Sequence, residues 1–283
     1  MKRLPLSAAA TLSLLVLSLV LSACSGGGSA GQATIRVGSK DFTEEFILGE
    51  IYAQLLENAG FKVERKLNLG GTPVAQQALL NKEIDLYPEY TGTALVTVLK
   101  LPVDSDAQRV YQTVSQQYKD QFKLIWLDPA PMNDTQALAM TSQRAGQLGI
   151  KTISDMVAHA GELVMAGPPE FQDREDGLPG LKRVYGNFTL KEYKSIDPGL
   201  RYQALTSGQA DVVVAFSTDG EISAYKLVVL EDDKHLFPPY QVAPVVRQDV
   251  LDANPGIATA LNAVAPKLTN DVMSQLNYEV TGN

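Results

Sequence analysis

The sequence predicts an α/β protein, because short strand patterns and longer helix patterns alternate along most of the chain. This alternation runs from residue 33 to residue 90 and returns between residues 136 and 216. Strands that are joined by helices form parallel sheets, and the ligands of such sheets bind beyond the carboxyl ends of the strands. We therefore expect a binding site among the residues that directly follow the predicted strands.

The first part of the chain accounts for three strands and two helices. Thr43 is expected to cap the first helix, because Glu44 and Glu45 follow it and acidic residues are favoured in a first turn. The strand segments are apolar or alternate between apolar and polar residues. The predicted strands are residues 34–38, 61–67 and 83–87, and the predicted helices are residues 43–56 and 73–80.

The rest of the chain repeats this organisation and then turns back. Thr152 or Ser154 is expected to open a helix, and after a charged loop at residues 231–235 the chain returns as a strand. The predicted strands are residues 136–140, 163–166, 211–216 and 240–246, and the predicted helices are residues 152–160, 178–185 and 202–207, with one or two closing helices in residues 255–276.

The N-terminus has the order of a secretory signal peptide. Lys2 and Arg3 precede an apolar run at residues 12–21, which is shorter than the roughly 20 apolar residues of a membrane-spanning helix. Leu-Ser-Ala-Cys at residues 21–24 resembles a bacterial lipoprotein box, so we expect residues 1–23 to be removed and Cys24 to be lipidated. Residues 24–32 would then be the lipidated cysteine and a flexible tether. An ordinary signal peptide with an incidental cysteine is the alternative.

The composition excludes several classes of partner. Cys24 is the only cysteine, so an exported chain forms no internal disulfide and depends on its core for stability. Removal of residues 1–23 takes away Lys2 and Arg3 but no acid, so 24 basic residues become 22 against 32 acidic ones. Nucleic acids and anionic membrane surfaces require clustered lysine and arginine. We therefore expect neither a nucleic-acid partner nor a polybasic membrane patch.

A candidate ligand-binding turn lies at residues 84–93, which read Ile-Asp-Leu-Tyr-Pro-Glu-Tyr-Thr-Gly-Thr. An apolar strand ends here in two tyrosines, two threonines and a glycine. Such a turn offers backbone N–H groups, hydroxyl groups and an aromatic face within a short reach. This combination suits a small ligand that carries a cation and an anion on one molecule.

Five short motifs occur in order along the chain. They are Gly-Ser-Lys-Asp-Phe-Thr-Glu at 38–44, Asp-Leu-Tyr-Pro-Glu-Tyr-Thr-Gly-Thr at 85–93, Arg-Glu-Asp-Gly at 174–177, Phe-Ser-Thr-Asp-Gly at 216–220 and Phe-Pro-Pro-Tyr at 237–240. Together they closely resemble the glycine betaine/choline/carnitine-binding proteins of osmoprotectant ABC transporters, over nearly all of residues 34–276. The resemblance implies a type II periplasmic binding protein, in which two α/β lobes are joined by two crossover strands and the ligand lies in the cleft. The first lobe would be residues 33–135 plus 240–283, and the second residues 136–239.

The resemblance also implies how the ligand is held. In the family an aromatic cage grips the quaternary ammonium head, and basic and hydroxyl side chains grip the carboxylate tail. A trimethylammonium group has no N–H to donate and is attracted by desolvated π-faces, whereas a carboxylate takes charge-assisted hydrogen bonds. The matching residues are Tyr90 and Tyr240 in the cage, Asp134 facing the head group, and Lys40, Thr93 and Arg174 at the tail.

Two cage positions depart from the family pattern. Gln136 and Phe216 stand where the family usually has tyrosine, so we predict both at the head group. Phenylalanine keeps the aromatic face and loses only the hydroxyl. Glutamine has no aromatic face, so that wall of the cage is open or hydrogen-bonding, and we expect a weaker or differently specific site. Restoring the wall with Gln136→Tyr is expected to tighten glycine betaine binding.

Several of these residues also have a purely structural alternative. A tyrosine fits a surface turn, a lysine a solvated loop, and an arginine among acids a surface salt bridge. Tyr87 is expected in the core rather than in the site. The alternatives are a turn residue for Tyr90, a loop charge for Lys40, a salt bridge to Asp173, Glu175 or Asp176 for Arg174, a helix cap for Thr93 and Asp219, and a core residue for Phe216.

No catalytic motif supports an enzyme. Outside the Gly/Ser-rich tether at residues 24–32, the chain contains no Gly-x-Ser-x-Gly, His-Glu-x-x-His or Walker-type sequence, and neither His159 nor His235 has a motif around it. Asp232 and Asp233 beside His235 are typical of a solvated charged turn. We therefore expect no metal and no cofactor.

The favoured function is an extracytoplasmic receptor, lipid-anchored in the periplasm or at the outer face of the cell membrane. We expect a monomer that binds a betaine-like quaternary ammonium osmoprotectant, glycine betaine or similar, and delivers it to an ABC permease. One alternative is the same receptor fold for another small zwitterionic or cationic solute. The other is an exported α/β enzyme that acts on a small zwitterion.

Overall fold

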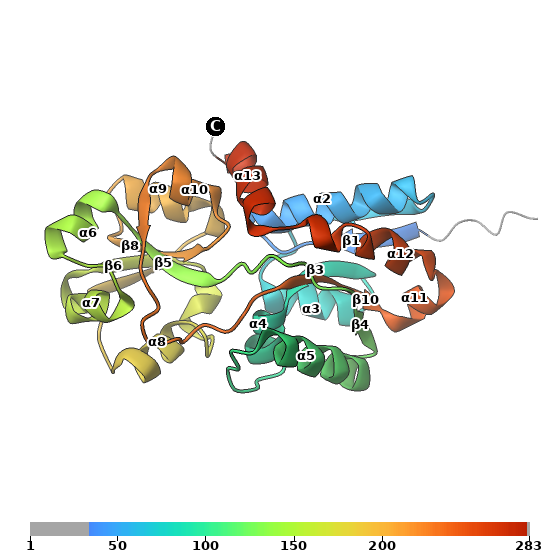
Figure 1. Cartoon of the computed structure of the whole chain (residues 1–283), viewed down its shortest axis with the longest axis horizontal. Coiled ribbons are helices and arrows are strands. Elements are labelled where there is room, and N and C mark those ends of the chain that lie inside the picture. Colours follow the sequence, from blue (N-terminus) through green and yellow to red (C-terminus); the bar gives the residue numbers. More distant parts are fainter. Residues whose placement is uncertain (1–33, 282–283) are drawn as a thin grey trace, which may run out of the picture. The chain divides into compact units, whose positions relative to one another are not determined.

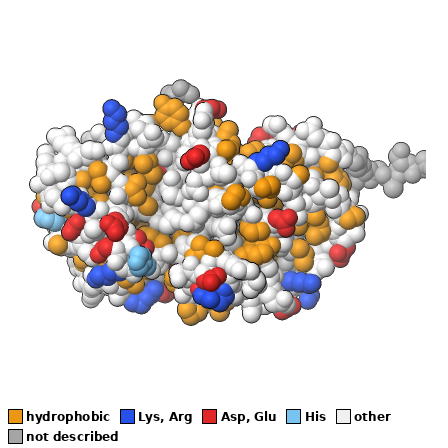
Figure 2. All heavy atoms as spheres, in the orientation of Figure 1, with side chains coloured by type: hydrophobic (Ala, Val, Ile, Leu, Met, Phe, Trp, Pro, Cys, Tyr) orange, Lys and Arg blue, Asp and Glu red, His pale blue; other side chains and the backbone are white. Residues whose placement is uncertain are grey.

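Two five-stranded sheets, each covered by helices, make up the part of the chain that the structure describes (Figure 1). The structure is a computed structural model, and it describes residues 34–281. The predicted signal peptide, the lipidation of Cys24 and the tether lie outside the described residues. On the face in Figure 2, acidic side chains lie among the basic ones.

The first sheet takes strands from both ends of the described chain. Its order is β2-β1-β3-β10-β4. Strand β1 is parallel to β2 and β3, whereas β10 is antiparallel to β3 and β4. The strands are β1 (Thr34–Gly38), β2 (Lys62–Lys66), β3 (Leu86–Tyr90), β4 (Leu124–Trp126) and β10 (Val242–Arg247).

The second sheet has the order β7-β6-β8-β5-β9. Strand β6 is parallel to β7 and β8, whereas β5 is antiparallel to β8 and β9. Both sheets are therefore mixed, and the prediction of purely parallel sheets is wrong. The strands are β5 (Gln136–Thr141), β6 (Val164–Gly167), β7 (Glu192–Ser195), β8 (Val212–Phe216) and β9 (Leu227–Val229).

Strands β5 and β10, which are antiparallel to both of their neighbours, are the strands that the chain reaches on crossing from one sheet to the other. Two parallel neighbours need a long crossover between them, usually a helix. The chain passes from β4 to β5 and from β9 to β10 without a helix, as Figure 1 shows. Strands β5 and β10 therefore run in the opposite direction to their neighbours in the sheet that they join. These two connections carry residues of the candidate site.

The helices cover the sheet faces (Figure 1). They are α2 (Thr43–Asn58), α3 (Thr72–Leu80), α4 (Thr91–Thr93), α5 (Ala107–Phe122), α6 (Ser142–Leu148), α7 (Ile153–Ala158), α8 (Leu178–Tyr185), α9 (Arg201–Thr206), α10 (Gly220–Ala224), α11 (Gln248–Ala253), α12 (Gly256–Asn262) and α13 (Asn270–Thr281), with short non-α turns η1 (Ala94–Val98), η2 (Ala160–Glu162), η3 (Pro169–Gln172), η4 (Pro198–Leu200) and η5 (Ala265–Lys267). None of the helices within residues 34–281 combines the length and the apolar character that crossing a membrane requires.

Several predicted ends of elements differ from the structure. Helix α2 begins at Thr43 itself, after Phe42, and no side chain caps it, so the prediction of Thr43 as the cap is wrong. Thr152 does cap α7, in a reciprocal pair of hydrogen bonds with Asp155. Strand β3 covers Leu86–Tyr90 rather than residues 83–87 and continues through Pro88.

Pro88 is tolerated in β3 because of its partner. A proline has no N–H to donate to a neighbouring strand and is usually confined to sheet edges. Here Pro88 lies opposite Pro244 of β10, so two residues without an N–H face each other. The strand therefore runs on to Tyr90, and the tyrosine at its end is held by the sheet.

A separate apolar cluster supports the region where the site lies. Tyr90 and Tyr240 both belong to it, together with Leu48 of α2 and Met273 of α13. All four side chains are buried. The two tyrosines are thus anchored in a packed core rather than in a mobile loop.

Candidate ligand-binding site

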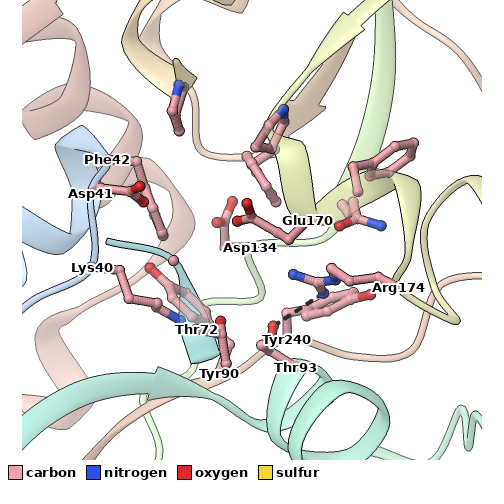
Figure 3. Close-up of a pocket in the computed structure, with 16 residues that line it drawn as sticks. Lys40, Asp41, Phe42, Thr72, Tyr90, Thr93, Asp134, Glu170, Arg174 and Tyr240 are labelled. Atoms are coloured by element: carbon pink, nitrogen blue, oxygen red, sulfur yellow. Dashed lines mark hydrogen bonds between the residues drawn. The ribbon is translucent and has the colours of Figure 1, made fainter. Parts of the chain in front are cut away.

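One cavity brings together all eight residues that the sequence predicts at the ligand (Figure 3). Their roles toward a ligand stay a prediction. The eight residues are Lys40, Tyr90, Thr93, Asp134, Gln136, Arg174, Phe216 and Tyr240, and the lining is completed by Asp41, Phe42, Gly71, Thr72, Pro168, Glu170, Phe171 and Pro198.

The lining residues lie where strands of both sheets end. The segment Lys40–Phe42 follows β1, Tyr90 is the last residue of β3, and Phe216 is the last residue of β8. Gln136 begins β5, and Tyr240 precedes β10. Arrangement of these side chains at strand ends follows the rule that α/β sheets bind ligands there.

Three aromatic rings lie close together in this cavity. Phe42 is stacked on Phe216 with ring centroids 6.0 Å apart, and its centroid is 6.2 Å from that of Tyr90. Sequence reasoning did not predict Phe42 as a site residue. Its position in the Gly-Ser-Lys-Asp-Phe-Thr-Glu motif, directly after β1, was the available signal.

Lys40 is not free to meet a ligand in this conformation. Its Nζ donates a hydrogen bond of 2.7 Å to Glu89 Oε1 and lies 3.6 Å from Glu45 Oε1. The same ammonium lies 4.7 Å from the Tyr90 ring centroid. Burial disfavours the charged ammonium, but Glu89 and Glu45 outweigh it and raise the pKa of Lys40. The loop-charge alternative is wrong, because Lys40 is buried.

Arg174 is held by a carboxylate that sequence reasoning did not place in the site. Its Nε and Nη2 donate to Asp176 at 2.8 and 2.5 Å, and Tyr240 Oη donates to Asp176 at 2.6 Å. Burial lowers the pKa of Arg174, but Asp176 more than offsets it and the pKa is raised. The salt bridge to Asp176 exists, but it is buried rather than on the surface.

Gln136 also binds to Asp176, through the backbone of that residue. Its Nε2 donates a 2.5 Å hydrogen bond to the backbone carbonyl of Asp176. The amide is therefore hydrogen-bonded rather than left open toward the cavity, which is one of the two outcomes that the sequence predicts for this wall. A tyrosine at position 136 would lose this bond at a buried position, which argues against a simple gain in affinity from Gln136→Tyr.

Gly92 is required by the close approach of Tyr240. A Cβ at position 92 would lie 2.8 Å from both the Pro239 carbonyl oxygen and Tyr240 Cδ1. Thr93 comes next in the chain, and its hydroxyl lies 3.5 Å from Arg174 Nη2, drawn dashed in Figure 3. The absence of a side chain at Gly92 thus lets the ring pack against the turn.

Asp134 belongs to a buried pair of carboxyl groups. Thr218 Oγ1 lies 2.6 Å from Asp134 Oδ1 and 2.5 Å from Glu44 Oε2. A hydroxyl has one proton, so the second short contact needs a proton on one of the two carboxyl groups. Burial, together with the neighbouring charge of Glu44, raises the pKa of Asp134 well above its ordinary value, and burial likewise raises the pKa of Glu44.

Glu44 connects this pair to the hydroxyl of Tyr90. Tyr90 Oη donates to Glu44 Oε1 at 2.7 Å, so the turn-residue alternative for Tyr90 is wrong. Tyr87 is a core residue as predicted, and its hydroxyl donates to Glu89 at 2.7 Å. Asp219 does not cap α10 with its side chain, because its Oδ2 accepts from the Phe216 N–H and from two side chains of α9.

Two more acids line the cavity. Asp41 follows Lys40, and burial raises the pKa of its carboxyl group. Glu170 comes from η3 in the second sheet's half of the cavity, and sequence reasoning missed both residues. The cavity is thus lined by three acids, counting Asp134, and by two cations that already have buried carboxylate partners.

Comparisons with known proteins show which family the chain is similar to. Residues 33–283 match a family model described as the substrate binding domain of an ABC-type glycine betaine transport system. The glycine-betaine-binding protein of Pseudomonas aeruginosa is 38% identical in an alignment over 279 residues that covers 94% of this chain and 89% of that protein. The carnitine transport binding protein OpuCC of Listeria monocytogenes is 35% identical over 277 residues, 95% of this chain and 89% of that protein.

A solved structure has the same fold. The crystal structure of a glycine betaine/carnitine/choline ABC transporter protein superposes with a TM-score of 0.69 at 29% sequence identity, over 88% of this chain and 92% of that one. The predicted fold, a type II periplasmic binding protein with two α/β lobes, is confirmed. The chain belongs to the family of substrate-binding domains of ABC-type glycine betaine transport systems.

Proposed function

We propose that this chain is an extracytoplasmic receptor that binds a betaine-like quaternary ammonium solute in the cavity between β3, β8 and the two connecting segments. The observation that carries the proposal is the group of aromatic rings beside a buried carboxyl group. The ring centroid of Phe42 lies 6.0 Å from that of Phe216 and 6.2 Å from that of Tyr90, and Asp134 lines the same cavity. Aromatic faces and a carboxyl group suit a cation that has no N–H to donate.

The head group would meet the aromatic residues of both sheets. Tyr90 and Tyr240 contribute from the first sheet's side and Phe216 from the second, and Phe42 supplies an aromatic face that compensates for Gln136. Each desolvated ring contributes roughly 0.5–2 kcal/mol to binding of a cation. In this proposal Gln136 acts through Asp176, whose backbone carbonyl it holds, rather than as a wall of the cage.

The tail would lie near Arg174, Thr93 and Lys40. Both cations have carboxylate partners in this conformation, so a ligand carboxylate would share them rather than find them free. The threonine hydroxyl is 3.5 Å from Arg174 and is available to the same tail. This arrangement supports a ligand whose tail is polar.

Closure of the cleft would be the output of binding. Hydrogen bonds already join residues of the two halves, among them Thr218 with Glu44. A solute that contacts both halves adds to these bonds and favours the closed state, which an ABC permease would recognise. The relatives named for glycine betaine and carnitine transport support import of such a solute.

The lipid anchor and the location follow from the leader sequence alone. Residues 1–23 as a signal peptide and Cys24 as the lipidated residue would hold the receptor at the periplasmic or outer face of a membrane. Membership of a family of substrate-binding proteins sets the exported-enzyme alternative aside. A different small zwitterion remains the competing ligand class.

The test is isothermal titration of the purified full-length chain with glycine betaine. We expect saturable one-site binding that is lost in Tyr90→Ala and in Arg174→Ala. Tyr225→Ala is the matched control, because Tyr225 is exposed and does not line the cavity. Binding that survives both cavity variants would refute this placement of the ligand, and no heat up to millimolar solute would refute glycine betaine as the ligand.

A further inference from the structure

The tail end of the cavity is already balanced in charge. Arg174 shares two hydrogen bonds with Asp176, and Lys40 lies against Glu89 and Glu45. A ligand carboxylate gains less from a cation whose charge is already neutralised by a buried partner. Recognition of the tail therefore depends on what else faces it.

Glu170 is the additional charge at this end. It lies in η3 between the second sheet and the cavity, and Figure 3 shows it reaching into the space near Arg174 and Asp134. Its electrostatic influence extends to Arg174. Charges in a partly buried cavity interact over several ångströms, so Glu170 acts on charged groups at this end without touching them.

Glu170 also crosses to the other half of the molecule. A Cβ at Gly71 would lie 3.0 Å from Glu170 Oε1 and 3.4 Å from Oε2, so the carboxylate lies directly against this glycine and would have to shift by a few tenths of an ångström to admit a side chain. Gly71 precedes α3, whose first turn carries the positive end of the helix dipole. Glu170 thus occupies a position that favours an anion, next to the candidate tail site.

We propose that Glu170 is a specificity-determining residue that selects a quaternary ammonium cation with an uncharged, hydroxyl-bearing tail over a zwitterion with a carboxylate tail. The inference rests on the proposed function, since it requires a quaternary ammonium ligand in this cavity. Glu170 repels a ligand carboxylate and occupies the end of α3 that would otherwise attract it. A hydroxyl tail meets no such repulsion and hydrogen-bonds Thr93 or Thr72, which both line the cavity.

The test compares two probes, choline and glycine betaine, which share the trimethylammonium head and differ in the charge of the tail. The full-length chain is titrated with each. We expect the wild-type chain to bind choline more tightly. In Glu170→Gln the ratio of the glycine betaine Kd to the choline Kd is expected to fall by roughly tenfold, about 1.4 kcal/mol.

Two further variants keep the result interpretable. Asp173→Asn removes the same charge from the same turn, at an exposed residue that does not line the cavity, and is expected to leave the ratio unchanged. Glu170→Asp keeps the charge and is expected to stay near the wild-type ratio. A ratio that does not change in Glu170→Gln, or that changes equally in Asp173→Asn, overturns the inference while the receptor function stands. Absence of binding by both probes refutes the proposed function, and with it this inference.

Discussion

Asp176 provides the sharpest test of how the site is held together. Its carboxylate is fully buried and accepts hydrogen bonds from Arg174 Nε and Nη2 and from Tyr240 Oη, at 2.5 to 2.8 Å. Asp176→Asn keeps the shape of the side chain but leaves the buried guanidinium without a countercharge. Breaking one side of a buried ion pair costs about 3–5 kcal/mol, so we expect the free energy of unfolding to fall by that amount at neutral pH.

The size of this effect should depend on pH in a defined direction. Burial would raise the pKa of Asp176, but Arg174 and the Tyr240 hydroxyl outweigh it, so the pKa lies below the ordinary value of 3.8. A carboxyl group with a depressed pKa stabilises the fold above its unfolded pKa, and that stabilisation is lost as the pH falls through the folded pKa. The difference between wild type and Asp176→Asn is therefore expected to be constant from pH 8 to about pH 5 and to shrink below about pH 4.

Urea unfolding at pH 7 measures the difference, and a neighbouring ion pair provides the control. Glu175 pairs with Arg183 at 2.6 Å, but the two side chains are 59% and 52% exposed. Glu175→Gln is expected to cost no more than about 1 kcal/mol, because exposed pairs contribute little. Equal costs for Asp176→Asn and Glu175→Gln would refute the view that the buried pair organises the tail end of the cavity.

Three further outcomes are expected. Gly92→Ala should abolish ligand binding and lower the free energy of unfolding by about 1–3 kcal/mol, since its Cβ would meet the Pro239 carbonyl oxygen at 2.8 Å. The control Gly146→Ala, on the open face of α6, should be neutral or stabilising, and calorimetric melting separates the two variants. Burial raises the pKa of Glu45 from 4.5 to about 8, so the folded protein holds this proton more tightly than the unfolded chain does. The free energy of unfolding should therefore fall as the pH rises from 4.5 to 8. Glu45→Gln should flatten this pH dependence in urea unfolding, and an unchanged slope would contradict the assignment. Tyr90→Phe keeps the ring but loses the hydrogen bond to Glu44, so the free energy of unfolding should fall by about 1–3 kcal/mol. Titration should show that ligand binding is retained, and a complete loss of binding would mean that the hydroxyl matters more than the ring.

The secondary structure was predictable where one residue pattern decided it. Helix α8 has the predicted bounds, and β8 differs from the prediction by one residue. Helix α5 was missed although Val110, Val114 and Tyr118 follow each other at the spacing of one helix face, because polar residues fill the other positions. The three-residue strands β4 and β9 carry too short a pattern to be recognised, since each exists through its pairing with a strand far away in the sequence.

The candidate site was likewise predictable only in part. The resemblance carried by the ordered motifs was sufficient to predict eight of the residues that line one cavity. It was not sufficient to predict the partners of the charged members. Lys40 and Glu89 are 49 residues apart in the chain, and their pairing depends on β1 and β3 lying side by side. Asp176 is close to Arg174 in sequence, but its burial depends on Tyr240, which arrives on the returning connection.

The C-terminal helix α13 links residues of the two halves, although it does not line the cavity. Asn277 Nδ2 of α13 donates to Glu44 Oε2 at 2.8 Å and to the Thr218 carbonyl at 2.9 Å. Helix α13 also lies directly over the start of α10, where a Cβ at Gly220 would be 2.4 Å from the Tyr278 backbone. Because Glu44 holds the Tyr90 hydroxyl and Thr218 contacts Asp134, separation of the two halves requires either breaking these buried bonds or moving α13 along with the second half. Helix α13 is therefore bonded to both halves, and the assignment of residues 240–283 to the first lobe stays a prediction.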